Sequence, residues 1–419
     1  MRKPDPEAMD GPPSAGVCAE GNGSDRNNRF LAADMEDVVT IRKIRPEDEP
    51  AVTELHRRHY WRSNCLLLNR NFYRWQLLLP PESAAAGGDQ SVVAVDKRGQ
   101  LLSFLAVAPA SAVFRARPMK GAHLISWLSP PEARGRGIGS AVISSVIDQY
   151  DFVFGRSPRP ASLSIFKRLG FRCLVSCRRW LAVLDPEAAV RLAVDANGAS
   201  AKRAAARKID IRGAAEGRID RTVPPAAASL ATEVLTDSTA FERTHDYLGW
   251  RYEMHPFFDY RFLSINGSRE PTGFAVVRIE DVSGRSGRVL RIIEFIAAPQ
   301  NSLSLANAVL SYGSEQQCAY ADMFGVSERF VSGFLAAGGF DAAEEPELRL
   351  PHLLQPWDPS IEMPDLIFYA RRDDRLAGGI GPADDMSLVH VSKGDTNLDW
   401  PSWVPTADGN SFAPKVERA

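Results

Sequence analysis

The sequence predicts an α/β protein made of two similar halves, with strands and helices interleaved along the chain. Alternating apolar and polar segments such as VVTIRKI, from Val38, are typical of strands, whereas the apolar residues of GIGSAVISSVIDQYD recur with the period of a helix. A similar order of elements recurs in the second half of the 419 residues. The composition, 44% hydrophobic and 24% charged, is that of a globular protein, and the length suggests two or three domains.

The first half begins with the strand at Val38 and continues into a helix, whose start is predicted by Pro46 and the acidic residues after it. A second short helix, NRNFYRWQLLLPP, is stopped by Pro80 and Pro81. The segment SVVAVDKRGQLLSFLAVAPASAVFRA predicts two strands around a turn at Gly99.

The strand GAHLISWLSPPE leads to the central helix of this half, which carries an apolar stripe that we expect to face a sheet. The stripe consists of Ile138, Val142, Ile143, Val146 and Ile147. The strand YDFVFG and the short helix ASLSIFKRLGF follow, and Gly170 is a favourable residue just after a helix end. We expect RCLVSCRRWLAVL to be the last strand of the half.

The second half repeats this order from about Ser229. The stretch that ends in Trp75 aligns with the one that ends in Trp250, and a proline follows each of them. The strands YRFLSI, GFAVVRIEDV, RVLRIIEFIAAP and AYADMFGV and the helices SLSLANAVLSYGSEQ and SERFVSGFLAAGGF keep the order of the first half. Matching elements in the same order predict a tandem repeat of one fold.

Changes in composition set the expected domain boundaries. The N-terminal residues are rich in Gly, Pro, Asp and Ser and are expected to be disordered, and a stretch rich in Ala, Arg and Gly is expected to link the halves. We expect Trp400 and Trp403 to pack against the body, because indole rings are unfavourable in water. The boundaries are 1–37 for the tail, 38–186 and 229–375 for the two domains, 187–228 for the linker and 376–419 for a C-terminal extension.

Charge and cysteine usage argue against several classes of protein. Lys and Arg together number 50 and Asp and Glu 52, and a net charge of −2 disfavours a nucleic-acid binder. The sequence contains no run of about 18 apolar residues, so we expect no membrane span. The N-terminus lacks the apolar core of a signal peptide, so we expect a cytoplasmic protein. The five cysteines form no CxxC pair, and no metal site is expected.

The most informative stretch is SWLSPPEARGRGIGSAVISSV, in which a strand runs through a glycine-rich loop into a helix. Glycines let successive backbone N–H groups converge, the helix start adds a positive end, and Arg134 and Arg136 add charge. The loop is either an anion cradle suited to a pyrophosphate or a tight turn with solvent-facing arginines. It lacks the Gly-Lys-Ser/Thr of a Walker A loop and the glycine spacing of a Rossmann fingerprint.

The spacing Arg134-x-x-Gly137-x-Gly139 resembles the acyl-CoA signature of the GNAT superfamily of N-acetyltransferases, and residues 166–171, FKRLGF, resemble that family's second motif. The resemblance covers 38–186 and reaches 229–372 by the repeat. It implies two domains, each with a mixed sheet that is splayed in the middle and flanked by helices. It also implies that acetyl-CoA, or another acyl-CoA, binds as co-substrate at Leu128, Ser129, Arg134, Gly135, Arg136, Gly137, Ile138, Gly139 and Ser140.

The resemblance also directs attention to catalytic residues. Its usual tyrosine acid is Phe166 here, which cannot donate a proton. His123 and Ser126 lie on the strand where a general base is expected, although a lone histidine on a strand is more often a packed or exposed residue.

The second half departs from the signature, because PQNSLSLAN replaces the glycine loop, so we do not expect it to bind CoA. Ser302 or Ser304 is expected to cap the helix there. Glu294 aligns with Ser126 and either faces outward or contacts the substrate amine as a base, and Asp322 invites the same two interpretations.

Two further clusters bear on the acceptor. Polar and aromatic residues crowd the LGWRYEMHP helix and form either an acceptor site or core packing: His245, Trp250, Arg251, Tyr252 and His255. With the late segment Lys393, Gly394, Asp395 and Asp399, this helix resembles GNAT proteins of bacterial polysaccharide gene clusters.

That resemblance implies an N-acyltransferase for a small amine such as an amino sugar. The alternatives are an aminoacyl or long-chain acyl transferase and a non-catalytic acyl-CoA-binding or scaffolding protein. The sequence carries no pattern that indicates an oligomeric state.

Overall fold

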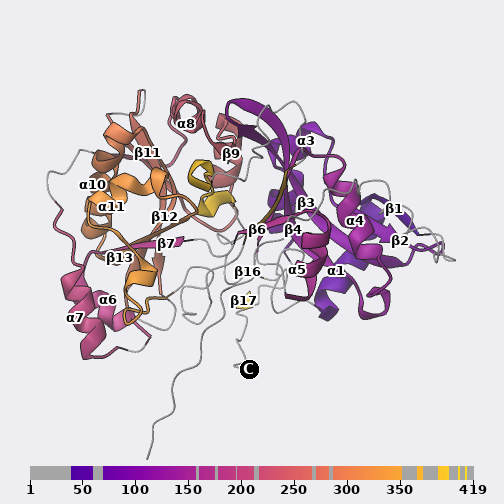
Figure 1. Cartoon of the computed structure of the whole chain (residues 1–419), viewed down its shortest axis with the longest axis horizontal. Coiled ribbons are helices and arrows are strands. Elements are labelled where there is room, and N and C mark those ends of the chain that lie inside the picture. Colours follow the sequence, from indigo (N-terminus) through magenta and orange to yellow (C-terminus); the bar gives the residue numbers. More distant parts are fainter. Residues whose placement is uncertain are drawn as a thin grey trace, which may run out of the picture.

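The computed structural model describes residues 39–59, 69–156, 160–174, 178–194, 196–211, 217–266, 270–282, 286–351, 366–370, 386–395, 404–405 and 411–412. Two bodies built on mixed sheets lie side by side, as Figure 1 shows. Across these ranges, no helix is both long and apolar enough to cross a membrane. The expected tail 1–37 and the residues Trp400, Trp403 and Asp399 lie outside the described residues.

The first sheet contains most strands of the N-terminal half and one strand from late in the chain. Its order is β1-β2-β3-β4-β5-β15-β6, and β9 pairs with β3 at one side. The strands are β1 (Thr40–Lys43), β2 (Val92–Val95), β3 (Leu101–Phe114), β4 (Arg117–Leu128), β5 (Phe152–Arg156), β6 (Arg172–Leu174), β9 (Thr239–Phe241) and β15 (Leu366–Ala370).

Helices cover both faces of this sheet. They are α1 (Glu49–His59), α2 (Arg70–Tyr73), the π-helical turn η2 (Arg74–Leu78), α3 (Pro81–Ala85), α4 (Ile138–Ile147) and α5 (Pro160–Arg168). The apolar stripe predicted for the central helix is confirmed, because all five of its residues are buried in α4. The helices α4 and α5 share one apolar core with the sheet, whereas α1 and α2 belong to a second core that also contains residues of the C-terminal half.

The second sheet has the order β14-β7-β13-β12-β11-β10-β8. Its strands are β7 (Arg178–Val183), β8 (Gly217–Asp220), β10 (Arg261–Ile265), β11 (Gly273–Asp281), β12 (Arg288–Ala297), β13 (Cys318–Gly325) and β14 (Phe340–Asp341). The helices around it are α6 (Pro186–Leu192), α7 (Gly198–Ala206), α8 (Ala227–Leu235), α9 (His245–Leu248), the π-helical turn η4 (Gly249–Glu253), α10 (Pro299–Glu315) and α11 (Ser332–Ala336).

The two halves exchange a strand. The stretch expected as one closing strand of the first half is divided into β6, which stays in the first sheet, and β7, which pairs with β13 and β14 of the second. In return, β15 pairs with β5 and β6 of the first sheet. The stretch 187–228 also carries α7 and β8, and β8 pairs with β10. The domain boundaries stay a prediction, and so does the tandem repeat, which the matching strand orders support.

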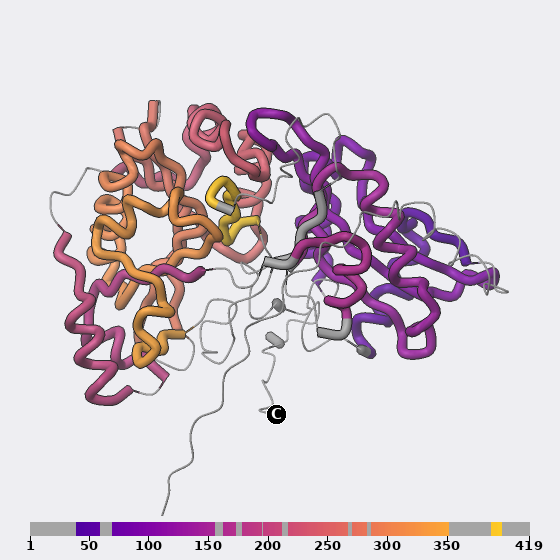
Figure 2. The backbone as a smooth tube through the Cα atoms, in the orientation of Figure 1, coloured from indigo at the N-terminus to yellow at the C-terminus, as the bar shows by residue number. Residues whose placement is uncertain are grey.

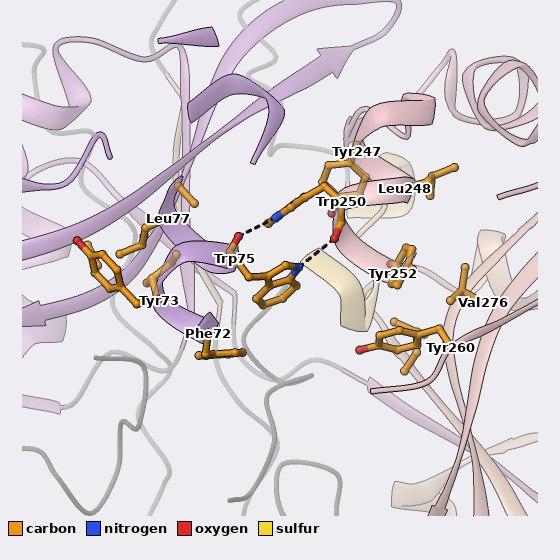
Figure 3. Packing of buried hydrophobic residues seen from close by; sticks show 14 of the residues in the cluster. Phe72, Tyr73, Trp75, Leu77, Tyr247, Leu248, Trp250, Tyr252, Tyr260 and Val276 are labelled. Carbon is orange, nitrogen blue, oxygen red and sulfur yellow. Dashed lines mark hydrogen bonds between the residues drawn. The ribbon is translucent and has the colours of Figure 1, made fainter. Parts of the chain in front are cut away.

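The interface between the halves is centred on two tryptophans. The indole Nε1 of Trp75 donates to the Trp250 carbonyl at 2.9 Å, and the indole Nε1 of Trp250 donates to the Trp75 carbonyl at 2.7 Å, as the dashed lines of Figure 3 show. Their rings stack with centroids 5.5 Å apart. Each tryptophan lies on a π-helical turn, η2 or η4. Reciprocal contacts of this kind are typical of interfaces with two-fold symmetry, and they support the predicted repeat.

A late segment of the chain lies between the halves. Residues 386–395, which include η7 (Met386–Leu388) and η8 (Lys393–Asp395), form the yellow coil at the centre of Figure 2. Val389 bridges to Thr239 of β9, and the His390 amide donates to the Thr239 carbonyl at 2.9 Å. The side chains of Lys393 and Asp395 are buried. This part of the expected C-terminal extension therefore packs into the body.

Candidate functional site

The first sheet opens where β4 bulges. The register between β3 and β4 shifts after Ala106, which leaves Ile125 as an extra residue. On its other side, β4 runs parallel to β5 and pairs with it as far as Leu124, which lies opposite Gly155. Beyond this pair, the described strands pair with residues 126–128 on the β3 side, and the sheet opens beside this end of β4. A mixed sheet that opens at a bulge agrees with the fold that the resemblance implies.

The glycine loop follows that end of β4. The chain leaves β4 through η3 (Pro131–Ala133) and enters α4 at Gly137, its N-cap residue. The φ angles of Gly135 and Gly137 are +78° and +76°, in the left-handed region that glycine adopts without strain. The Arg134 Nε donates to the Ser129 carbonyl at 3.3 Å, and Arg134 and Arg136 are exposed. Left-handed turns, a helix start and two exposed cations together favour an anion.

Gly139 is needed for packing rather than for its φ angle. A Cβ atom at this position would lie 2.2 Å from Cζ2 of Trp127 on β4. The Trp127 ring in turn meets Phe166 edge to face at 5.8 Å, and Phe166 packs on Phe171 at 5.0 Å. The FKRLGF motif therefore supports the strand that flanks the gap, and Phe166 is a core residue.

The predicted cofactor residues lie together along this edge and loop. They are Leu128, Ser129, Arg134, Gly135, Arg136, Gly137, Ile138, Gly139 and Ser140. The side chains of Leu128 and Ile138 are buried, so only their backbone groups could contact a ligand. The arrangement fits the nucleotide and pantetheine parts of an acyl-CoA, with a cationic loop for the phosphates and a strand edge for the arm. This assignment stays a prediction.

His123 lies on β4 just before the opening and is buried, with its ring 5.5 Å from that of Phe154. Its face of the sheet borders a cavity of about 30 Å³, which lies between the halves. The cavity is lined by Gln76, Ala108, Pro109, Ala110, His123, Phe241, Tyr247, Trp250, Arg251, Gly394 and Asp395. The structure thus brings His123 together with polar residues of the second half, whereas Ser126 is half-buried just after the bulge of β4.

The second sheet opens at the corresponding place. The register between β11 and β12 shifts after Val276, which leaves Ile293 as the extra residue, and β12 pairs with β13 as far as Ile292, opposite Met323. The residue after the bulge is Glu294, as Ser126 is in the first sheet. The alignment of these two positions predicted from the sequence therefore matches the geometry of the sheets.

The outward-facing interpretation of Glu294 is wrong, because the residue is 1% exposed. Its Oε1 accepts from Arg243 Nε at 3.0 Å and from the Tyr252 hydroxyl at 2.6 Å, and its Oε2 accepts from Arg243 Nη2 at 3.2 Å. Burial raises the pKa of Glu294, and the Arg243 charge offsets part of that rise. Both oxygens are thus occupied by protein groups. The proposed role of Glu294 as a base stays a prediction, which this geometry does not favour.

Arg243 joins Glu294 to the late segment. Its Nη2 also donates to Asp395 Oδ2 at 2.6 Å and to the Ser392 hydroxyl at 3.2 Å, and its Nη1 donates to the Phe241 carbonyl at 2.7 Å. Sequence reasoning did not single out Arg243, because nothing local distinguishes an arginine whose partners lie 51 and 152 residues away.

The late segment crosses the second opening. The Val391 carbonyl lies 3.2 Å from where a Cβ on Gly325 of β13 would sit, and a Cβ on Gly394 would lie 2.9 Å from Glu294 Oε1 on β12. A small cavity of about 20 Å³ remains, lined by Ile293, Phe295, Met323, Phe324, Gly325, Val326, Ser327, Phe330, Val331, Val389, His390, Val391 and Ser392. The strand edge that is accessible in the first sheet is therefore covered in the second by the chain itself.

Other expectations for the second half are corrected by the structure. The helix α10 begins at Pro299, its N-cap residue Ala298 makes no side-chain cap, and the Ser302 hydroxyl instead accepts from the Gly333 amide at 3.0 Å. The prediction that Ser302 or Ser304 caps this helix is therefore wrong. Asp322 is also buried, and its Oδ2 accepts from Arg179 Nη2 at 2.7 Å and from Arg291.

The polar and aromatic cluster of the LGWRYEMHP helix divides between packing and the cavity. Trp250 and Arg251 line the cavity, and Tyr252 binds Glu294. His255 is a core residue whose ring stacks on Phe258 at 4.8 Å, and His245 is exposed.

No family model and no curated protein sequence matches the chain. Among solved structures, the chain is similar to a GCN5-related N-acetyltransferase from Anabaena variabilis, with a TM-score of 0.51 and 11% identity over 80% of this chain and 73% of that one. It is also similar to a conserved protein of unknown function from Enterococcus faecalis, a probable N-acyltransferase, with a TM-score of 0.50 and 13% identity over 80% of this chain and 72% of that one. These likenesses show the fold: two mixed sheets flanked by helices, as in GCN5-related N-acetyltransferases.

Proposed function

We propose that the protein is an acyl-CoA-dependent N-acyltransferase that uses acetyl-CoA and acts on a small amine such as an amino sugar. The observation that carries the proposal is the opening of the first sheet at the β4 bulge, beside the loop of Arg134, Gly135 and Gly137. A strand edge offers backbone hydrogen bonds to an extended pantetheine arm, and the loop offers charge and amides to phosphates. The second half lacks this loop and its edge is covered, so one donor site per chain is expected.

When bound, acyl-CoA would supply the acyl thioester. The residues of the chain would hold the donor at 126–129 and at the loop, and backbone N–H groups near the bulge would stabilise the charge on the thioester oxygen. His123 borders the cavity between the halves, and an imidazole can serve as a general base for an ammonium group. The neutral nitrogen would then form the C–N bond while the C–S bond breaks and CoA leaves as thiolate. The nitrogen would release its second proton in this step, and that proton would neutralise the thiolate.

Isothermal titration with acetyl-CoA tests the donor site. We expect one CoA per chain, and we expect Arg134→Ala and Gly137→Ala each to weaken binding at least about tenfold, because each removes a charge-assisted contact or distorts the N-cap turn. The matched controls are Arg98→Ala and Gly99→Ala, an exposed arginine and a glycine with φ +79° in the hairpin turn between β2 and β3. Absence of CoA binding, or equal effects in the control pair, would overturn the proposal.

A second candidate function is acyl-CoA binding without catalysis, which is favoured by the buried Phe166 at the position where the resembling family has a tyrosine acid. A thiol-release assay across primary amines separates the two. Release that depends on the amine supports the transferase. Stoichiometric CoA binding without release for any amine would support the non-catalytic protein instead.

A further inference from the structure

This inference rests on the proposed function. We propose that Asp395 is the carboxylate that anchors the ammonium group of the acceptor, in the cavity between the halves that also contains His123. The acceptor site would then be completed by the segment 386–395, which crosses the opening of the second sheet before its end lines the cavity.

The position of the segment supplies the first argument. Residues 391–394 run from Gly325 on β13 to Glu294 on β12, across the opening of the second sheet. The segment ends in η8, whose Gly394 and Asp395 line the cavity opposite residues of β3 and β4. In the first half, the corresponding opening would hold the donor. In the second half, the opening is filled by residues 391–394, and the next residue, Asp395, lines the cavity beside the first half.

The hydrogen bonds of Asp395 supply the second argument. Its Oδ2 accepts from Arg243 Nη2 at 2.6 Å and from the Ser392 amide and hydroxyl at 2.9 and 3.3 Å. Among the residues that the structure describes, Oδ1 receives only the Tyr247 hydroxyl, at 3.3 Å. Because Tyr247 is itself a wall residue of the cavity, we infer that Oδ1 faces the cavity, where a carboxylate oxygen can accept from a second donor.

The charge of Asp395 supplies the third argument. Burial is the largest influence and acts to raise its pKa. The Arg243 and His390 charges and the hydrogen bonds from Arg243 and the Ser392 amide together hold the pKa below its usual range. Glu294, which shares Arg243, has its pKa raised by burial. The carboxylate whose pKa is lowered is therefore the one that lines the cavity, and a buried carboxylate with an accepting oxygen favours a cationic donor.

The rest of the wall indicates the class of ligand. Arg251, held by a 2.8 Å bond from its Nε to the Gly394 carbonyl, lies on the same side as Asp395 and favours an oxygen of the ligand. A cavity of about 30 Å³ admits a small group rather than a whole sugar. The ligand group is thus a primary ammonium next to a hydroxyl, as in an amino alcohol.

Ligand-observed NMR on the full chain, without CoA, tests this inference separately from donor binding. The probe is ethanolamine, and ethylene glycol is its uncharged counterpart. We expect the wild-type protein to bind ethanolamine in preference to ethylene glycol, and Asp395→Asn to weaken ethanolamine binding about 10- to 100-fold. The matched control is Asp322→Asn, which loses a buried carboxylate bound to arginines but lies away from the cavity, so probe binding should stay within about twofold.

Asp395→Asn removes a buried ion pair, and its fold is checked by circular dichroism. If it does not fold, Tyr247→Phe decides, because it keeps the carboxylate and frees Oδ1 from the tyrosine hydroxyl. Ethanolamine should then bind more tightly than to the wild type, whereas a merely structural role of the Asp395 contact predicts equal or weaker binding of both probes. Absence of ethanolamine binding, binding no tighter than that of ethylene glycol, or an unchanged affinity in Asp395→Asn would overturn the inference even if acetyl-CoA binds.

Discussion

The reciprocal tryptophan contact predicts a measurable coupling between the halves. Trp75→Phe removes the indole donor that binds the Trp250 carbonyl at 2.9 Å and leaves that buried acceptor without it. An unsatisfied buried acceptor costs about 1–3 kcal/mol, and the missing ring adds about 1 kcal/mol. We therefore expect the free energy of unfolding to fall by about 2–4 kcal/mol, and by a similar amount in Trp250→Phe.

The double variant gives the test. Because the two rings stack 5.5 Å apart, the two losses should overlap by about 0.5–1.5 kcal/mol in a double-mutant cycle. The assay is urea unfolding followed by circular dichroism. Trp180, which is buried in the second sheet, provides the control, since Trp75→Phe and Trp180→Phe should be additive. Additivity of the Trp75 and Trp250 changes within about 0.3 kcal/mol would refute the reasoning.

Three further predictions concern pH, the donor loop and the ion cluster. Burial lowers the pKa of His56 to about 4 from the ordinary 6.5. The free energy of unfolding should therefore fall by about 3 kcal/mol as the pH decreases from 6.5 to 4. Urea unfolding at a series of pH values should show this loss in the wild type, and an equal loss in His56→Gln would contradict the prediction. Gly139→Ala places a Cβ 2.2 Å from Trp127 and should weaken acetyl-CoA binding at least about tenfold, as measured by titration calorimetry. Unchanged affinity would show that the loop tolerates a side chain. Glu294→Gln breaks the buried ion pair with Arg243 and should lower the free energy of unfolding, measured in urea, by about 3 kcal/mol. The pH profile of thiol release should stay unchanged. Loss of one limb of that profile would instead identify Glu294 as the base.

The donor loop could be predicted from the sequence because its chemistry is local. Gly135 and Gly137 are close neighbours of the helix they precede, and the stripe of α4 shows its period within ten residues. The strand exchange could not be predicted in this way. An apolar run such as RRWLAV indicates a buried strand, but nothing in it states which of two similar sheets it joins.

The ion cluster shows the same limit for charged residues. Glu294 between two apolar neighbours favours an outward position until a partner is known, and that partner, Arg243, is 51 residues away on another element. Asp395 belongs to a short motif visible in the sequence, but its place beside His123 depends on the path of the chain across the second sheet. Gln76 gave no signal at all, because one glutamine on an amphipathic helix is ordinary.

The exchanged strands also bear on how the chain is synthesised. The strand β5 has its outer partner in β15, which begins about 210 residues later, so on a ribosome that adds about 5–20 residues per second the first sheet stays incomplete for about 10–40 seconds. During that interval an apolar strand edge is open to other nascent chains. The N-terminal half cannot finish folding before the C-terminal half has left the ribosome, and a stop codon just before β15 should yield aggregated chains rather than a working N-terminal domain.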